Sequence, residues 1–126
     1  APDGGLVVAD AQTAGRGRMN RRWVTQPGSA LAFSLVLHPR GGEIEKLPFF
    51  APLAGLAVSQ ALESLGLSPE IKWPNDVLLE RRKVCGILVE AAWNGSHSKG
   101  VVIGIGVNVA PSSVPPAAWN KRWANQ

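Results

Sequence analysis

Hydrophobic positions change their spacing several times along the chain, and each change marks a predicted element. Residues 6–9 (LVVA) form a short apolar run, which predicts a buried strand. Apolar and polar residues alternate over residues 30–39 (ALAFSLVLHP), which predicts a half-buried strand that Pro39 ends. Residues 49–65 show helical spacing, and Gly66 follows as a C-terminal cap. The apolar stripe of this helix, the face that such helices bury, consists of Leu53, Leu56, Ala57, Ala61 and Leu65.

Strands joined by hairpins dominate the second half of the chain. Residues 71–73 are predicted as a short strand, and residues 77–79 and 83–92 as the two strands of a hairpin. An Asn-Gly turn then leads to a last strand over residues 100–109. There is no alternation of strand and helix typical of a Rossmann sheet. The pattern therefore predicts an α+β fold, with a mixed, largely antiparallel sheet and helices packed on one face.

Composition places the chain among ordinary globular domains. It has 126 residues, of which 45% are hydrophobic and 17% charged, and its net charge of +4 weakly favours anionic partners. No apolar run is long enough to span a membrane. The single cysteine, Cys85, cannot form an internal disulfide, which fits the cytoplasm, and is expected to be a small buried hydrophobe. We expect residues 1–110 to form the core and residues 111–126 a linker or tail of a longer protein.

Positive charge is concentrated in the loop between the first two strands. The segment GRGRMNRRW (residues 15–23) holds four arginines, two glycines and Trp23, with no acidic residue between Thr13 and Gln26. Neighbouring arginines in a solvated loop repel each other by about 1 kcal/mol per pair, and an anionic ligand would relieve this repulsion. We therefore predict a loop that is mobile when empty and ordered by an anion. A solvated basic loop, or a loose nucleic-acid contact, remains the alternative.

The last predicted strand has one nearly bare face. In GVVIGIGVNVA (residues 100–110) the odd positions are β-branched, whereas the even positions include Gly104, Gly106 and Asn108. Glycine inside a strand often marks the close approach of a ligand or of another backbone. A flat ligand lying over Gly104 and Gly106, with a hydrogen bond from Asn108, would explain the pattern. Tight packing of another element against this face is the alternative.

The central hairpin carries charged residues among apolar ones. On facing strands, Asp76 and Lys83 would lie about four residue steps apart, roughly 13 Å, and would touch different parts of an elongated ligand. The alternative is that Lys72–Glu90 or Lys83–Asp76 are surface ion pairs of little energetic weight. The sequence shows no metal-ligand spacing and no arrangement of a serine, cysteine or histidine nucleophile, so any metal ligands stay unknown.

Three segments together resemble the catalytic domain of biotin protein ligases of the biotin–[acetyl-CoA-carboxylase] ligase type. They are ADAQTAGRGRMNRRW, KWPNDVLLERRKVCGILVE and VVIGIGVNV, and the resemblance extends over residues 6–109. It implies activation of biotin by Mg-ATP to biotinyl-5′-AMP and pyrophosphate, followed by transfer to a lysine of a biotin carboxyl carrier domain. It also implies a class II aminoacyl-tRNA synthetase-like fold, with the arginine loop closing over biotin and the adenylate.

The resemblance also implies roles for individual residues. Arg18 should hold the adenylate, Lys83 should contact the biotin carboxylate and the phosphate, and Asp76 should position Mg-ATP or the incoming lysine. These three are the implied catalytic residues. The implied substrate-binding residues are Gln12, Gly15 and Arg16 for biotin, Trp23 near the adenine, Gly86 at the biotin rings, and Gly104 and Asn108 at the adenine.

The chain departs from the family pattern at several points. Asn20 stands where the family usually has glycine in the arginine loop, and asparagine tolerates left-handed backbone. The family's Ser-Thr-Asn segment and small C-terminal domain have no counterpart in the 126 residues, so the chain resembles a catalytic domain truncated at both ends, with reduced or no turnover expected. No DNA-binding helices precede the first strand, so DNA binding is not expected, nor is a membrane partner. The alternatives are a lipoate or octanoate ligase or transferase of the same fold, and a basic nucleic-acid-binding module.

Overall fold

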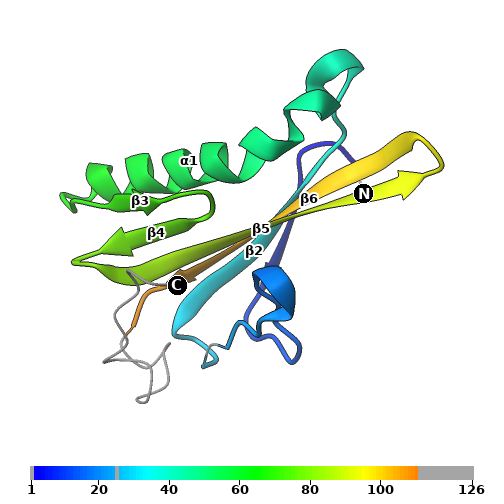
Figure 1. Ribbon diagram of the computed structural model, residues 1–126. Coiled ribbons are helices and arrows are strands. Elements are labelled where there is room, and N and C mark those ends of the chain that lie inside the picture. The colour runs from blue at the N-terminus through cyan, green and yellow to red at the C-terminus, as the bar shows by residue number, and fades with distance from the viewer. Residues whose placement is uncertain (1, 25, 111–126) are drawn as a thin grey trace.

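A six-stranded sheet organises the part of the chain that the computed structural model describes, residues 2–24 and 26–110. The strand order is β1-β2-β6-β5-β4-β3, and every neighbouring pair is antiparallel (Figure 1). The α+β class and the antiparallel sheet are confirmed. The described strands include no parallel pair, so the prediction of a mixed sheet was wrong. The helix that follows β2 leads the chain to the far edge of the sheet, and the strands from β3 to β6 are then joined in succession as hairpins. The strands are β1 (Gly5–Ala9), β2 (Ala30–Leu37), β3 (Glu70–Lys72), β4 (Asp76–Leu79), β5 (Arg82–Asn94) and β6 (His97–Asn108).

One face of the sheet is covered by helix α1 (Phe50–Ser64), which a 3₁₀ segment, Gly41–Phe49, precedes (Figure 1). Gly66 ends the helix as predicted: its φ is +83°, and its N–H donates to the Glu63 carbonyl while that of Leu67 donates to the Leu62 carbonyl. This is a Schellman motif, which satisfies carbonyls that the helix end leaves open. No helix of the described residues has both the length and the apolar content to cross a bilayer.

The predicted buried face of α1 was wrong. Leu53, Leu56 and Leu65 are exposed, because the helix turns a neighbouring stripe toward the sheet. Small residues lie on that stripe, which lets the helix backbone approach the core strands closely. The residues of α1 that are buried or packed against the core are Phe50, Ala51, Ala54, Gly55, Val58, Ser59 and Leu62.

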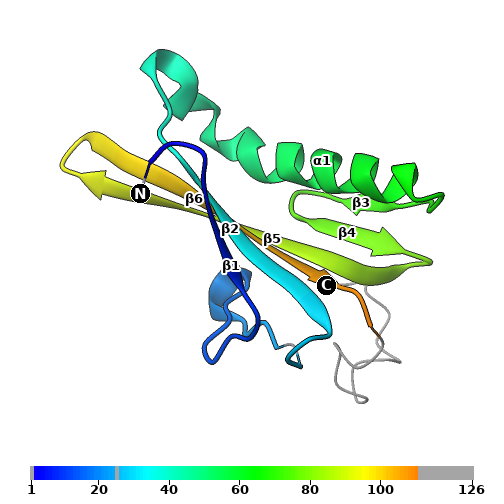
Figure 2. The same cartoon turned by 180° about the vertical axis from the view of Figure 1, so that it is seen from behind.

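Strand β1 forms where predicted, but it is not buried. Leu6, Val7 and Val8 each remain about 60% exposed, because β1 is an edge strand and α1 lies over the other end of the sheet (Figures 1 and 2). Between α1 and strands β2 and β6 runs an open apolar groove of about 580 Å³ that includes Phe33 and Leu53. The core is therefore concentrated under α1, around Val77, Cys85, Ile87, Val101 and Ile103.

The turn between β4 and β5 is built from residues that suit it poorly. Leu79 pairs with Arg82, and the two residues between them, Glu80 and Arg81, have φ values of 50° and 64°. Two consecutive left-handed residues are typical of a type I′ turn, which favours Asn-Gly. Replacing Glu80-Arg81 by Asn-Gly should raise the free energy of unfolding by about 1 kcal/mol. Urea denaturation measures this, and a Gln-Gln replacement, which removes the charges but keeps the strain, should give no gain.

Candidate functional site

The arginine loop folds against the face of the sheet opposite to α1 (Figures 1 and 2). Two backbone hydrogen bonds shape it into a small hairpin, from Trp23 N–H to the Gly15 carbonyl at 2.9 Å and from Gly17 N–H to the Arg21 carbonyl at 2.6 Å. At its tip, η1 (Arg18–Asn20), the φ of Asn20 is 60°. Asparagine therefore adopts the left-handed conformation expected of it, and the loop keeps its turn without a glycine there.

Gly15 has a structural role in this hairpin. A Cβ at this position would collide with the Trp23 carbonyl oxygen and would come within 3.1 Å of the Gln12 side-chain oxygen. The glycine is therefore required where the two arms of the loop meet, and close approach of a ligand is not needed to explain it.

The loop and the sheet enclose a cavity of about 240 Å³. Strands β2, β5 and β6 form its floor, and the side chains of Arg16 and Arg18 reach it from the loop. Gly15, Asp76 and Asn108 do not line it, although each contacts a residue that does. The predicted site residues that line the cavity are Gln12, Arg16, Arg18, Trp23, Lys83, Gly86 and Gly104.

Trp23 covers part of the bare face predicted for the last strand. A Cβ on Gly106 would lie 2.6 Å from its Cε2, and one on Gly86 would lie 2.7 Å from its Cζ3. Gly104 remains open, since the nearest atom to a Cβ there is the Leu88 carbonyl oxygen at 3.5 Å. At Gly106 the structure therefore shows the alternative, packing of another part of the chain against this face, whereas a ligand at Gly104 stays a prediction. The chain's own indole occupies the second position, because two glycines facing each other across β5 and β6 leave room for a ring.

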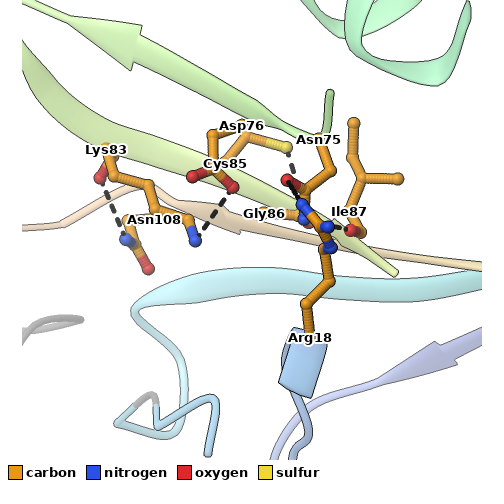
Figure 3. A network of polar contacts seen from close by, with 8 residues as sticks. All are labelled: Arg18, Asn75, Asp76, Lys83, Cys85, Gly86, Ile87 and Asn108. Atoms are coloured by element: carbon orange, nitrogen blue, oxygen red, sulfur yellow. Dashed lines mark hydrogen bonds and ion pairs between the residues drawn. The ribbon is translucent and has the colours of Figure 1, made fainter. Parts of the chain in front are cut away.

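Lys83 and Asp76 form an ion pair, with Nζ and Oδ1 3.0 Å apart and side chains only 20% and 15% exposed (Figure 3). The predicted separation of roughly 13 Å was wrong. The register shifts between Val77 and Leu78, so that Lys83 and Gly86 point to the same face, and the long lysine side chain spans the remaining distance. Lys83 Nζ also lies 5.4 Å from the centre of the Trp23 ring.

Asn108 lies beside this ion pair at the end of β6. Its side-chain nitrogen donates to the Lys83 carbonyl at 3.5 Å, and its side-chain oxygen is buried without a hydrogen-bond partner among the described residues (Figure 3). A buried acceptor without a donor is unfavourable. The oxygen is therefore suited to a donor that a ligand brings.

Two residues that anchor the loop, Glu90 and Asn75, were not predicted from the sequence. Arg16 forms an ion pair with Glu90 at 3.0 Å, and Arg18 Nη1 donates to the Asn75 side-chain oxygen at 3.1 Å. The loop itself holds no acidic residue, as the sequence showed, and the partner of Arg16 comes instead from β5, far away in sequence. Alternation along β5 could have indicated Glu90, which shares a face with Gly86, whereas no pattern indicates Asn75.

Cys85 is fully buried beneath the site, as predicted. Burial raises the pKa of its thiol to about 12; the Lys83 charge partly opposes this rise and the Asp76 charge adds to it. At pH 8 the native thiol should therefore react with iodoacetamide at least about a hundredfold more slowly than in urea, because the thiolate is the nucleophile. Alkylation of the folded protein at the unfolded rate would contradict the buried position of this strand.

Folding stability should also fall in strongly alkaline solution because of this thiol. Burial holds the pKa of this thiol in the folded protein above its ordinary value of 9.0, so the contribution is fully present below pH 9 and is lost as the pH rises toward 12. The described residues contain no group of three or more histidine, cysteine, aspartate or glutamate side chains placed to hold a metal ion.

Comparison with known proteins identifies the family. The model of the biotin/lipoate A/B protein ligase family matches residues 1–108. The chain is 46% identical over 114 residues to the bifunctional ligase/repressor BirA of Bacillus spizizenii, covering 90% of this chain and 35% of the relative. It is 42% identical to the biotin–[acetyl-CoA-carboxylase] ligase of Paracoccus denitrificans, covering 89% of this chain and 51% of that protein.

Solved structures agree with the sequence comparison. The biotin protein ligase from Aquifex aeolicus, solved in complex with biotin and ATP, superposes with a TM-score of 0.77 and 40% identity over 93% of this chain. The match covers 47% of that structure, so the chain spans about half the length of this neighbour and about a third to a half of the two relatives above. Sequence, fold and matched range thus agree, and the chain belongs to the biotin/lipoate A/B protein ligase family.

Proposed function

We propose that this chain forms the biotin- and nucleotide-binding part of a biotin protein ligase. It would join biotin to AMP at the expense of Mg-ATP, with release of pyrophosphate, and pass the biotinyl group to a lysine of a biotin carboxyl carrier domain. One observation carries the proposal: Arg16, Arg18 and Lys83 converge on a single cavity between the sheet and the loop that folds over it. The relative from Paracoccus denitrificans is named a biotin–[acetyl-CoA-carboxylase] ligase, and one solved neighbour is a complex with biotin and ATP.

The arrangement suits acyl adenylation chemically. A carboxylate oxygen attacks the α-phosphorus of ATP, an O–P bond forms, and the bond to pyrophosphate breaks. Both reacting groups are anions, so cations fixed between them lower the barrier. Lys83 and Arg18 both line the cavity, the first from β5 and the second from the loop. Closure of the loop would then protect the mixed anhydride from water.

The two ends of the cavity suggest a division between the substrates. The surface at Gly104 is open and would receive biotin, whereas Trp23 covers the other side of the cavity, next to Lys83, whose carbonyl accepts a hydrogen bond from Asn108. At about 240 Å³ the cavity lies below the 300–1,000 Å³ typical of small-molecule sites. The nucleotide would therefore enter as the Trp23 indole leaves Gly106, and the indole would then pack beside the adenine.

Magnesium would arrive with ATP as part of the substrate. Mg²⁺ typically keeps several waters and binds through phosphates with one or two carboxylates. Asp76 is a carboxylate beside the cavity that could serve this way, after its ion pair with Lys83 opens. A site of this kind needs no cluster of protein ligands, which fits the donor set of the described residues.

Three further expectations belong to the same proposal. The antiparallel sheet with its helix would be related to the class II aminoacyl-tRNA synthetase fold. Residues 1–110 would be the catalytic core, with residues 111–126, which lie outside the described residues, as a tail. The reaction would take place in the cytoplasm.

Biotin-dependent exchange of labelled pyrophosphate into ATP tests the proposal. We expect exchange with biotin, at the reduced rate that the sequence predicts for this chain, and none with lipoate or octanoate, which separates the lipoate-type alternative of the same family. We expect it to be lost in Arg18→Ala. A protein that binds nucleic acid with steep salt dependence and shows neither exchange nor biotin binding would favour the nucleic-acid alternative.

A further inference from the structure

Asn75, in the turn between β3 and β4, contacts the arginine loop although no substrate role has been assigned to it. Its side-chain oxygen accepts a hydrogen bond from Arg18 Nη1 at 3.1 Å, and its side-chain nitrogen donates to the Ile87 carbonyl at 3.0 Å (Figure 3). The backbone N–H of Ile87 in turn donates to the Asn75 carbonyl at 3.0 Å. Three hydrogen bonds thus link the turn, strand β5 and the loop through this one residue.

The contacts leave the amide of Asn75 only one useful orientation. The Ile87 carbonyl can only accept, so it selects the NH₂ group, and the oxygen must then point toward Arg18. Ile87 is itself buried in the core, which keeps its carbonyl in place. Asparagine offers a donor and an acceptor at this length, whereas aspartate offers two acceptors and alanine offers neither.

The cations of the cavity differ in their partners. Arg16 is paired with the carboxylate of Glu90 and Lys83 with that of Asp76, each at 3.0 Å. Arg18 instead meets a neutral amide, and no ion pair of Arg18 occurs within the described part of the chain. An amide holds the guanidinium in position but leaves its full charge available to an anion.

We propose that Asn75 is a positioning residue that holds Arg18 over the cavity without neutralising it. Arg18 is thereby the cation reserved for the phosphate of the acyl-adenylate, whereas Arg16 is already compensated by Glu90. This assignment rests on the proposed function for the identity of the anion. The placement of Arg18 by Asn75 is a property of the ligand-free protein and does not depend on the proposed function.

A double-mutant cycle tests whether Asn75 acts through Arg18. The affinity for biotinol-5′-AMP, a hydrolysis-resistant analogue of the acyl-adenylate, is measured calorimetrically for the wild type, Asn75→Ala, Arg18→Ala and the double variant. Each single variant should lose about tenfold in affinity, as for a lost hydrogen bond to a charged group. The double variant should lose no more than Arg18→Ala alone. Losses that multiply would overturn the proposal, because Asn75 would then act by another route, such as holding the turn.

Asn75→Asp tests the importance of neutrality. The carboxylate keeps an acceptor for Arg18 but compensates its charge, so affinity for the analogue should fall about tenfold while the loop stays held in place. Hydrogen exchange of residues 13–24 in the ligand-free protein should therefore be faster in Asn75→Ala than in Asn75→Asp. The same chemical change at the exposed end of β5, Asn94→Asp, should leave affinity and exchange unaltered. Wild-type affinity in Asn75→Asp would overturn the proposal.

The two measurements separate failure of the inference from failure of the proposed function. If the wild type binds neither biotin nor the analogue, the proposed function fails, and with it the assignment of Arg18 to a phosphate. The exchange experiment still decides the positioning role in that case. Equal exchange of residues 13–24 in the wild type and Asn75→Ala would reject that role.

Discussion

Lys83→Ala is expected to lower the affinity for biotinol-5′-AMP by about a hundredfold, a typical loss when one member of a largely buried charge pair is removed. The variant removes the cation that, in the proposed function, would face the biotin carboxylate and the phosphate. It also leaves the Asp76 carboxylate, which is only 15% exposed, without the lysine that lies 3.0 Å from it. The uncompensated carboxylate would then repel the anionic ligand. Both changes act in the same direction, and calorimetric titration measures their sum.

A second variant separates stability from binding. Lys83→Ala should also lower the free energy of unfolding, because it leaves an uncompensated carboxylate in a partly buried site. Combining Lys83→Ala with Asp76→Asn should recover that stability without recovering tight binding. Lys99→Ala, on an exposed part of β6, is the matched control and should change neither. Unchanged affinity for the analogue in Lys83→Ala would show that this lysine does not contribute to ligand binding.

Gly106→Ala is expected to displace the Trp23 indole and open the arginine loop. A Cβ at this position would lie 2.6–2.8 Å from three atoms of the ring, which is closer than van der Waals contact allows. The ring must therefore leave its position over the strand. Overpacking of this kind destabilises by about 1–3 kcal/mol. We expect faster hydrogen exchange in residues 13–24, together with a lower urea midpoint if the loop contributes to stability.

Gly104 provides the matched control for this prediction. It lies on the same strand and the same face, but a Cβ there meets its nearest atom at 3.5 Å, an ordinary contact. Gly104→Ala should therefore leave the loop closed while narrowing the cavity for biotin. In a Trp23→Ala background, Gly106→Ala should cost little further stability, because the ring atoms that its Cβ would meet are gone. Equal effects of the two alanines on loop exchange would show that Trp23 does not occupy the position described here.

The elements of the fold could be predicted from the sequence because local patterns define them. Alternation, helical spacing, Gly66 and the Asn-Gly turn mark strands, helix and turns within a few residues. Burial could not be predicted in the same way. Leu53 and Leu6 are apolar and regularly spaced, yet both are exposed, because the position of each element in the sheet decides which apolar face is covered. That depends on strand order, which no local pattern carries.

The same limit applies to the candidate site. The bare face of β6 and the arginine loop were visible because each is a local departure from ordinary composition. The partners of the loop were not, since Glu90 lies 74 residues from Arg16 and Asn75 lies 57 residues from Arg18. The distance between Asp76 and Lys83 was wrong because it depends on a register shift in β4–β5 and on the reach of a lysine side chain. Pairings across the sheet therefore determine the electrostatics of the site.

A crystal structure of the chain with biotinol-5′-AMP tests the central claim most directly. The account predicts the acyl group against Gly104 and Leu88, the phosphate between Arg18 and Lys83, and the indole of Trp23 moved from Gly106 to the side of the adenine. The analogue bound elsewhere, for example in the apolar groove between α1 and β2, with Trp23 still on Gly106 and Arg18 still directed away from it, would contradict the account.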